Sequence, residues 1–206
     1  MSRLRVIQLQ YDLTPVAGLA LVGHYLKTLA PVLSRLDRML PVRSGVRNSD
    51  IVRSYLGLLV QGKSDFEAIE NFRGDAFFKQ ALDIAVLPSS PTLRQRLDAQ
   101  ADGLAVHTSA MIETLLLAHR PDYGVLPCGW LPVDIDTFAM LRMDNSGTAK
   151  EGVGCTYAGV DGFCPLAVYL GSYGFCLELS LRPGPQSTRS RTPMRTCGAS
   201  YRWHSA

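Results

Sequence analysis

The sequence lacks any apolar run approaching the roughly 18 residues that a membrane-spanning helix requires. It also lacks a charged and then apolar leader of the kind that directs secretion. A membrane-spanning protein is therefore excluded, and we expect a soluble, cytoplasmic chain with no membrane partner.

Cysteine and histidine are few, and neither occurs in a metal-binding pattern. The five cysteines are odd in number and form no CxxC pair, and no histidine has a partner four residues away on a predicted helix. A disulfide framework and a zinc site are both disfavoured. In a reducing compartment we expect four of the cysteines to be buried thiols, namely Cys128, Cys155, Cys164 and Cys176.

An excess of charge of one sign is also missing. The chain has 21 basic and 18 acidic residues among 206, so its net charge of +3 does not by itself indicate a nucleic-acid partner. The length allows one large domain or two small ones, and 47% hydrophobic residues are enough for a packed core.

Leucine and valine recur at helical spacing through residues 15–122. Val16–Leu40 predicts one helix that Pro31 kinks or divides. A second helix over Asp50–Val60 is capped by Asn48 or Ser49, with Ile51, Tyr55, Leu58 and Leu59 facing inward. Shorter helices follow over Asp65–Phe72, capped by Ser64, and over Asp75–Ala85.

A polar helix start stands out in this region. Ser90 is the expected cap and Pro91 occupies the first turn. The exposed residues that follow are Thr92, Arg94, Gln95 and Arg96. A short helix, a turn and a helix opening on such residues is typical of a helix-turn-helix reader, whose side chains contact phosphates and base edges. An ordinary helix with a basic surface explains the same pattern, and both interpretations stay open.

Residues 131–184 predict three successive short strands separated by Gly, Asn and Asp turns. The first strand carries Asp134 and Asp136 in its middle. Their i, i+2 spacing places both carboxylates on one face, where they repel unless a hard cation or water compensates them. The two carboxylates are either metal ligands or a solvated strand end.

Five ordered motifs in this stretch and its flanks carry a resemblance to a known family. They are Asp134-Ile135-Asp136-Thr137, Asp144 to Val153, Thr156 to Pro165, Tyr169-Leu170-Gly171 and Leu181 to Gly184. Together they resemble the first part of the catalytic domain of DDE-type insertion-sequence transposases. Less sharply, the resemblance extends back over the helical part, so that it covers residues 15–186.

The resemblance implies an RNase H-like domain that performs Mg²⁺-dependent phosphoryl transfer on transposon-end DNA. It places the first catalytic carboxylate and metal ligand at Asp136, with Asp134 as the alternative. A second Asp and a Glu would follow beyond Gly184, but Gln186–Ala206 contains no acid and has neither helical nor strand period. We therefore expect an inactive transposase fragment whose partners are DNA, a second copy or a full-length transposase. Asp144 and Asp161 are expected to be turn residues.

Two other functions remain open at this point. One is a non-enzymatic DNA-binding protein that inhibits transposition by occupying element ends. The other is a small metal-dependent nuclease, which the absence of a second acidic cluster disfavours.

The expected fold class is α+β, with four parts. Residues 1–14 form a lead or arm, 15–122 a helical DNA-binding region, 123–184 the first three strands of an incomplete RNase H-like domain, and 185–206 a disordered tail outside the family pattern, for which a basic nucleic-acid-binding tail is the alternative. Without a later parallel strand, Leu131–Phe138 would be an exposed sheet edge.

Overall fold

A computed structural model describes residues 14–141 and 152–185 of the chain. The expected lead up to residue 13, the turn residue Asp144, Cys197 and the tail from Gln186 onward lie outside the described residues. The chain divides into two compact units, Met1–Leu104 and Ala105–Ala206. The division falls inside a helix, earlier than the change from helix to strand that begins at Arg120, where the sequence placed the boundary.

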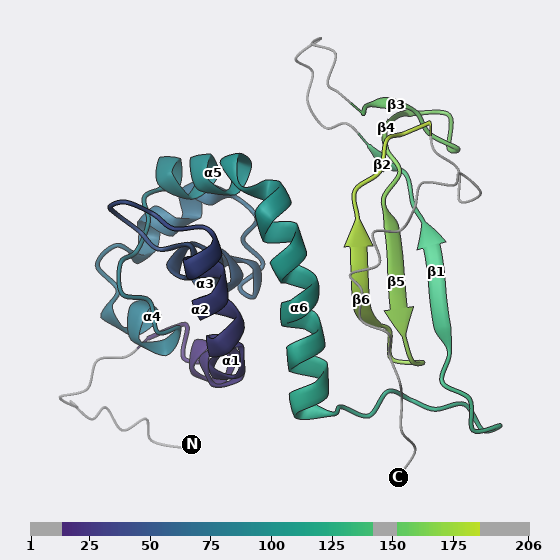
Figure 1. The fold of residues 1–206 in the computed structure, drawn as a ribbon, viewed down its shortest axis with the longest axis horizontal. Helices are drawn as coiled ribbons and strands as arrows, with labels where there is room; N and C mark the ends of the chain where they lie inside the picture. The colour runs from purple at the N-terminus through teal and green to yellow at the C-terminus, as the bar shows by residue number, and fades with distance from the viewer. Residues whose placement is uncertain (1–13, 142–151, 186–206) are drawn as a thin grey trace, which may run out of the picture. The chain divides into compact units, whose positions relative to one another are not determined.

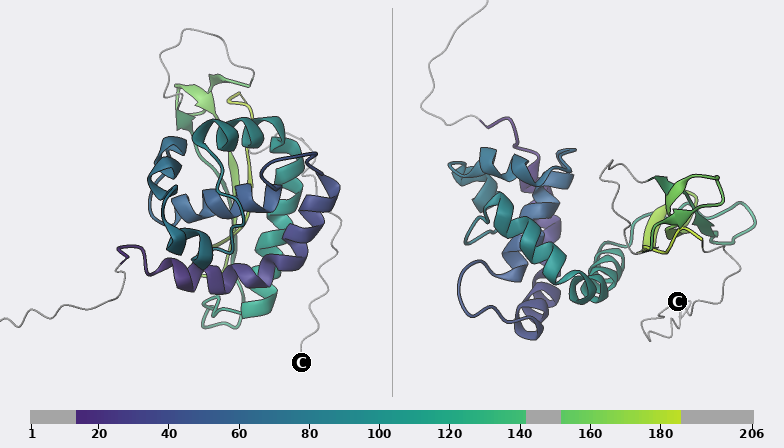
Figure 2. Two further views of the ribbon diagram at one scale, coloured as in Figure 1. Left: turned by 90° about the vertical axis from the view of Figure 1, so that its left-hand side faces the viewer. Right: turned by 90° about the horizontal axis from the view of Figure 1, so that it is seen from above.

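Unit 1 is helical, as predicted. It contains α1 (Leu19–Leu26), η1 (Lys27–Leu29), α2 (Ala30–Met39), α3 (Asn48–Leu59), η2 (Phe66–Phe72), α4 (Ala76–Ala81) and α5 (Ser90–Ala99), with α6 (Ala101–His119) running across the division (Figure 1). The predicted break at Pro31 is confirmed. Pro31 lies in the first turn of α2, and the 3₁₀ turn η1 just before it joins the two helices at a bend (Figure 2).

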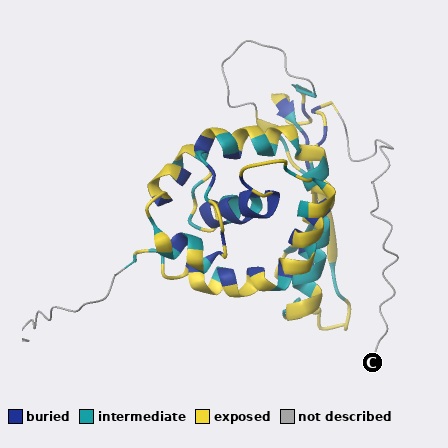
Figure 3. Cartoon of the chain, turned by 60° about the vertical axis from the view of Figure 1, so that its left-hand side comes forward, coloured by how far each residue is buried: buried dark blue, intermediate teal, exposed yellow. Residues whose placement is uncertain are grey.

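Helix α3 is the centre of unit 1, where it contacts α1, α2, η2 and α5. Its buried residues extend around most of its circumference (Figure 3). Ile51 and Leu58 are buried as predicted, but Leu59 is exposed on the side away from this core. Phe78 of α4 stacks on Phe72 of η2 and completes the core.

The predicted caps of α3 are wrong. Arg47 is the N-cap residue, and the Asp37 carboxylate of α2 supplies the missing acceptor. It accepts the Ser49 backbone N–H at 2.8 Å and the Ser49 hydroxyl at 2.7 Å. Asn48 instead donates its side-chain amide to the Leu40 carbonyl at 2.7 Å. The cap therefore comes from a residue twelve positions earlier, which local spacing does not reveal.

Two further caps shift by one residue. Asp65, not Ser64, accepts the Glu67 backbone N–H at the start of η2. Ser89, not Ser90, accepts the Thr92 backbone N–H at the start of α5. Ser90 is buried, and its backbone N–H donates to the Glu70 carboxylate at 2.7 Å.

Unit 2 contains two small antiparallel sheets in its described part. The larger has the order β1–β5–β6, from Val133–Thr137, Leu166–Leu170 and Phe175–Ser180. The smaller has the order β2–β4–β3, from Met140–Leu141, Asp161–Phe163 and Gly154–Cys155. Gly171 and Gly174 take positive φ angles in the turn that joins β5 to β6, which glycine adopts without strain.

The α+β content is therefore confirmed in coarse form, as helices followed by small antiparallel sheets. Among the described residues no parallel strand is present, and β1 lies at the edge of its sheet as predicted. The expectation of four buried cysteines is wrong, because only Cys164 is buried. Cys128 lies in a turn, while Cys155 and Cys176 lie on the edge strands β3 and β6, where one side of each strand faces solvent.

Within the described ranges, no helix combines the length and the apolar character that crossing a bilayer requires.

Candidate functional site

The exposed start of α5 presents Arg94 and Gln95 to solvent. Leu93, which directly precedes Arg94, is fully buried and anchors this turn in the core. Arg94 pairs with Glu67 at 2.7 Å and lies over the Phe66 ring at 5.4 Å. Because the Arg94 and Glu67 side chains are 52% and 58% exposed, this ion pair contributes little stability and can be exchanged for another anion.

Arg96 has a different environment from Arg94. It is half-buried and donates to the Asn48 side-chain oxygen at 3.0 Å and to the Val46 carbonyl at 3.4 Å. Since Asn48 in turn holds the Leu40 carbonyl, Arg96 connects α5 to the loop between α2 and α3. The structure thus uses Arg96 to join three segments of unit 1.

Thr92 is also engaged inside the protein. Its hydroxyl lies 2.8 Å from that of Ser89, and the residue is half-buried. Of the four predicted DNA-contacting residues, Arg94 and Gln95 face outward, whereas Thr92 and Arg96 hold the start of α5 in place.

The Glu70 carboxylate of η2 also holds the start of α5 in place. The Glu70 carboxylate pairs with Arg73 at 2.6 Å and accepts the Ser90 backbone N–H. The hydrogen bond from Arg73, followed by that from Ser90, holds the pKa of Glu70 below its ordinary value. The carboxylate is therefore charged near neutral pH and can keep this contact to α5.

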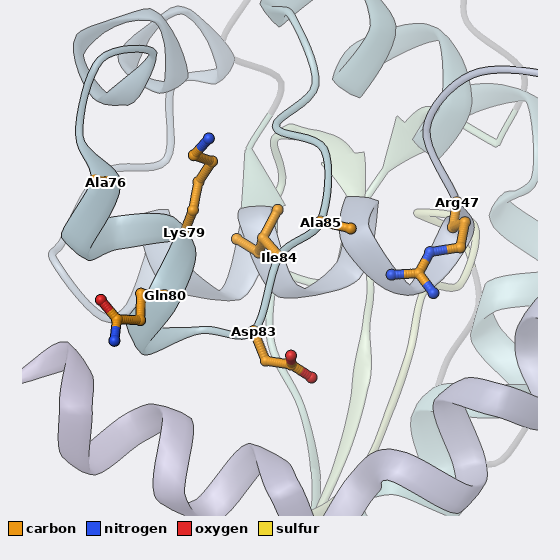
Figure 4. A pocket seen from close by; sticks show the side chains of 7 residues that line it. All are labelled: Arg47, Ala76, Lys79, Gln80, Asp83, Ile84 and Ala85. Carbon is orange, nitrogen blue, oxygen red and sulfur yellow. The ribbon is translucent and has the colours of Figure 1, made fainter.

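A hollow of about 460 Å³ lies on unit 1 beside α4, away from the residues that sequence reasoning singled out. Lys79 of α4 lies on one side and Arg47 on the other, with Ile84 and Ala85 between them (Figure 4). Gln80 and Asp83 complete its polar lining.

One of the segments that line this hollow is a turn with an uncommon backbone conformation. Asp83 has φ of 54°, in the left-handed region that non-glycine residues rarely adopt. The buried Arg53 guanidinium holds this turn by donating to both the carbonyl and the carboxylate of Asp83. Beside it, the Asp50 carboxylate accepts the backbone N–H groups of Ala85 and Val86, each at 3.2 Å.

No local spacing in the sequence pointed to this hollow. Arg53 and Asp83 are thirty residues apart, and Asp50 is thirty-five residues from Ala85. The only short-range signal is the i, i+3 pair of Arg47 and Asp50, which is common on helices.

Asp134 and Asp136 lie on one face of β1, as predicted, together with Tyr169 and Ala167 of β5. Both carboxylates are exposed, and one oxygen of Asp136 accepts the Thr137 backbone N–H at 2.7 Å. Glu178 lies on the other face of the sheet. It pairs with Val168, which in turn pairs with Ile135. Asp161 is exposed on β4 of the other sheet.

These donors do not fit a pair of Mg²⁺ ions. A two-metal site needs carboxylates from several elements that converge on one point. No group of three or more His, Cys, Asp or Glu side chains suited to a metal ion occurs in residues 14–141 and 152–185. Asp136 and Asp134 are therefore two solvated carboxylates on an edge strand in this part of the chain.

Within the described part of the chain, the outer edge of β1 carries backbone groups without a strand partner. Pro132 and Phe138 bond towards β5, so the alternating residues Val133, Ile135 and Thr137 direct their N–H and C=O groups away from it. Thr137 is already satisfied, since its N–H donates to Asp136 and its carbonyl accepts the Tyr157 hydroxyl. The open part of the edge is thus Val133 and Ile135, each 53% exposed.

Comparison with known proteins gives no further assignment, since no protein-family model, curated protein or solved structure matches the chain.

Proposed function

We propose that this chain is a DNA-binding protein of the transposase type, and that unit 1 makes the DNA contacts. The observation that carries the proposal is the start of α5, where Arg94 and Gln95 face outward from a turn anchored by buried Leu93. A guanidinium and a carboxamide on one exposed helical turn are suited to phosphates and base edges. The weak Arg94–Glu67 pair can open, so that Arg94 can exchange Glu67 for a phosphate.

In this proposal the DNA is the end of a mobile element. A second copy of the chain or a full-length transposase is the protein partner. The support is the ordered set of motifs between Asp134 and Gly184, together with a sheet in which β1, β5 and β6 form an antiparallel unit. Occupying element ends without cutting them would make the chain an inhibitor of transposition.

The experiment is equilibrium binding of the purified full chain to duplex DNA, compared with a variant carrying Arg94→Ala and Gln95→Ala. We expect the variant to bind several-fold more weakly. The slope of its log affinity against log salt should be smaller by about the value for one phosphate contact. Lys63→Ala serves as a control, because Lys63 lies in the turn after α3 and not on α5. Equal affinity and equal salt dependence in the α5 variant would refute the role of this turn.

We also propose that the chain does not cleave DNA. Asp136, with Asp134 beside it, supplies carboxylates on one strand only, whereas metal-assisted phosphoryl transfer requires ligands from several elements. Incubation of plasmid DNA with the purified protein and Mg²⁺ or Mn²⁺ should leave it intact. Metal-dependent nicking that disappears in Asp136→Ala would refute this proposal.

A further inference from the structure

We infer that the hollow between Arg47 and Lys79 binds a phosphate of the DNA backbone. The inference rests on the proposed DNA binding and names a second contact site that the α5 residues do not include. Its ligand is a phosphodiester group, and its binding groups are the Lys79 ammonium, the Arg47 guanidinium and the Gln80 carboxamide.

The charged side chains around the hollow favour an anion. Arg47, Arg53 and Lys79 face two carboxylates, Asp50 and Asp83, so the group carries one net positive charge. Among residues 14–141 and 152–185, no carboxylate lies within ion-pair distance of Lys79. A concave surface with a net positive charge favours an incoming anion.

Both carboxylates are already engaged. The Asp50 side chain is 1% exposed, and its two oxygens accept the backbone N–H groups of Ala85 and Val86. Its contact with the Arg47 guanidinium, at 3.3 Å, is additional and longer. Asp83 is held by the buried Arg53. Neither acid pairs with Lys79 among the described residues, where the Asp83 side chain is 78% exposed and the Arg47 side chain 56% exposed.

The turn at Asp83, which lines the hollow, has an uncommon backbone conformation. A non-glycine residue in the left-handed region is uncommon and persists where its surroundings enforce it, often at binding sites. Here Asp83 is enforced by Arg53, whose buried Nε has no hydrogen-bond partner in the described structure. The protein thus tolerates a strained turn and an unsatisfied donor to keep the wall of this hollow fixed.

The geometry also suits the ligand. Lys79 and Arg47 lie on opposite sides of the hollow, and the small or apolar residues Ile84 and Ala85 separate them (Figure 4). A phosphodiester between them would receive a point charge from one side and a planar guanidinium from the other. The hollow also lies next to the contacts of α5 along the chain. Arg47 stands between Val46 and Asn48, which both accept hydrogen bonds from Arg96.

The test is DNA binding by the full chain carrying Lys79→Ala, with Arg47→Gln as a second variant. We expect Lys79→Ala to weaken binding about three- to tenfold at low salt and to reduce the slope of log affinity against log salt by about 0.9, the value for one phosphate contact. Arg47→Gln should act in the same direction. Lys79 forms no ion pair with any described residue, so its variant should keep the thermal midpoint of the parent.

Lys63→Ala is the matched control, because it removes an equal charge from the same unit outside the hollow and should leave the slope unchanged. Inorganic phosphate, compared with chloride at equal ionic strength, tests whether the hollow takes free phosphate instead. Phosphate-induced shifts of the Ala85 amide together with unchanged DNA binding by Lys79→Ala would overturn the inference.

Two further outcomes separate this inference from the proposed function. If the parent binds DNA but both hollow variants match Lys63→Ala, the hollow assignment is wrong and the DNA-binding proposal stands. If the parent shows no DNA binding at low salt, both are wrong.

Discussion

Two arginines two residues apart on α5 illustrate how context decides the role of a side chain. Arg94 is exposed, and its partner Glu67 is exposed as well, so the pair is exchangeable. Arg96 reaches inward to Val46 and Asn48 and thereby joins α5 to the α2–α3 loop. The sequence placed both on one basic surface, but only one of them is available to a ligand.

Arg96→Ala should destabilise the protein more than Arg94→Ala does. It leaves the Asn48 side-chain oxygen without its charged donor, and loss of a hydrogen bond to a charged group costs about 1.5–3 kcal/mol. We expect the free energy of unfolding to fall by roughly that amount, and by well under 1 kcal/mol in Arg94→Ala. Urea unfolding of both variants makes the comparison, and equal destabilisation would contradict these separate roles.

Among the strands, the open edge of β1 has the clearest consequence for self-association. Val133 and Ile135 have exposed apolar side chains, and the backbone groups on their outer side have no partner among residues 14–141 and 152–185. Such an edge can pair with another chain. Asp134 and Asp136 counter this tendency. In an antiparallel pair of two β1 strands centred on Ile135, each Asp134 would lie opposite an Asp136, and like charges opposite each other are unfavourable.

We therefore predict that Asp134→Asn with Asp136→Asn increases self-association of the full chain. Ile135→Lys, which adds a charge to the opposite face of the same edge, should decrease it. Light scattering against protein concentration at fixed salt measures both effects. Identical mass averages for the parent and the two variants would show that the β1 edge does not govern association.

The elements also show where sequence reasoning succeeds. The leucine periodicity and Pro31 predicted α1 and α2, and Pro91 marked the start of α5, because these signals are local. The cap of α3 was missed because its acceptor, Asp37, belongs to another helix. The sequence did not predict that β2, β3 and β4 form a second sheet. These strands have two or three residues each, which is too few to show an alternation of apolar and polar side chains.

For the whole molecule, the sequence predicted the order of helical and strand-rich regions and the exposed β1 edge. It did not predict the hollow, because its structure depends on Arg53 meeting Asp83 and Asp50 meeting Ala85 across thirty residues or more. The RNase H-like assignment rests on the motifs between Asp134 and Gly184. The order of β1, β5 and β6 does not by itself test it, so the RNase H-like fold stays a prediction.

We propose that this chain binds DNA through phosphate contacts from unit 1, although its net charge is only +3. The most direct measurement is fluorescence anisotropy of a labelled duplex titrated with the full chain at several salt concentrations. With contacts from α5 and from the hollow, we predict saturable binding whose log affinity falls linearly with log salt, with a slope of about −2 or steeper. Absence of saturable binding at low salt, or an affinity that does not change with salt, would contradict the account.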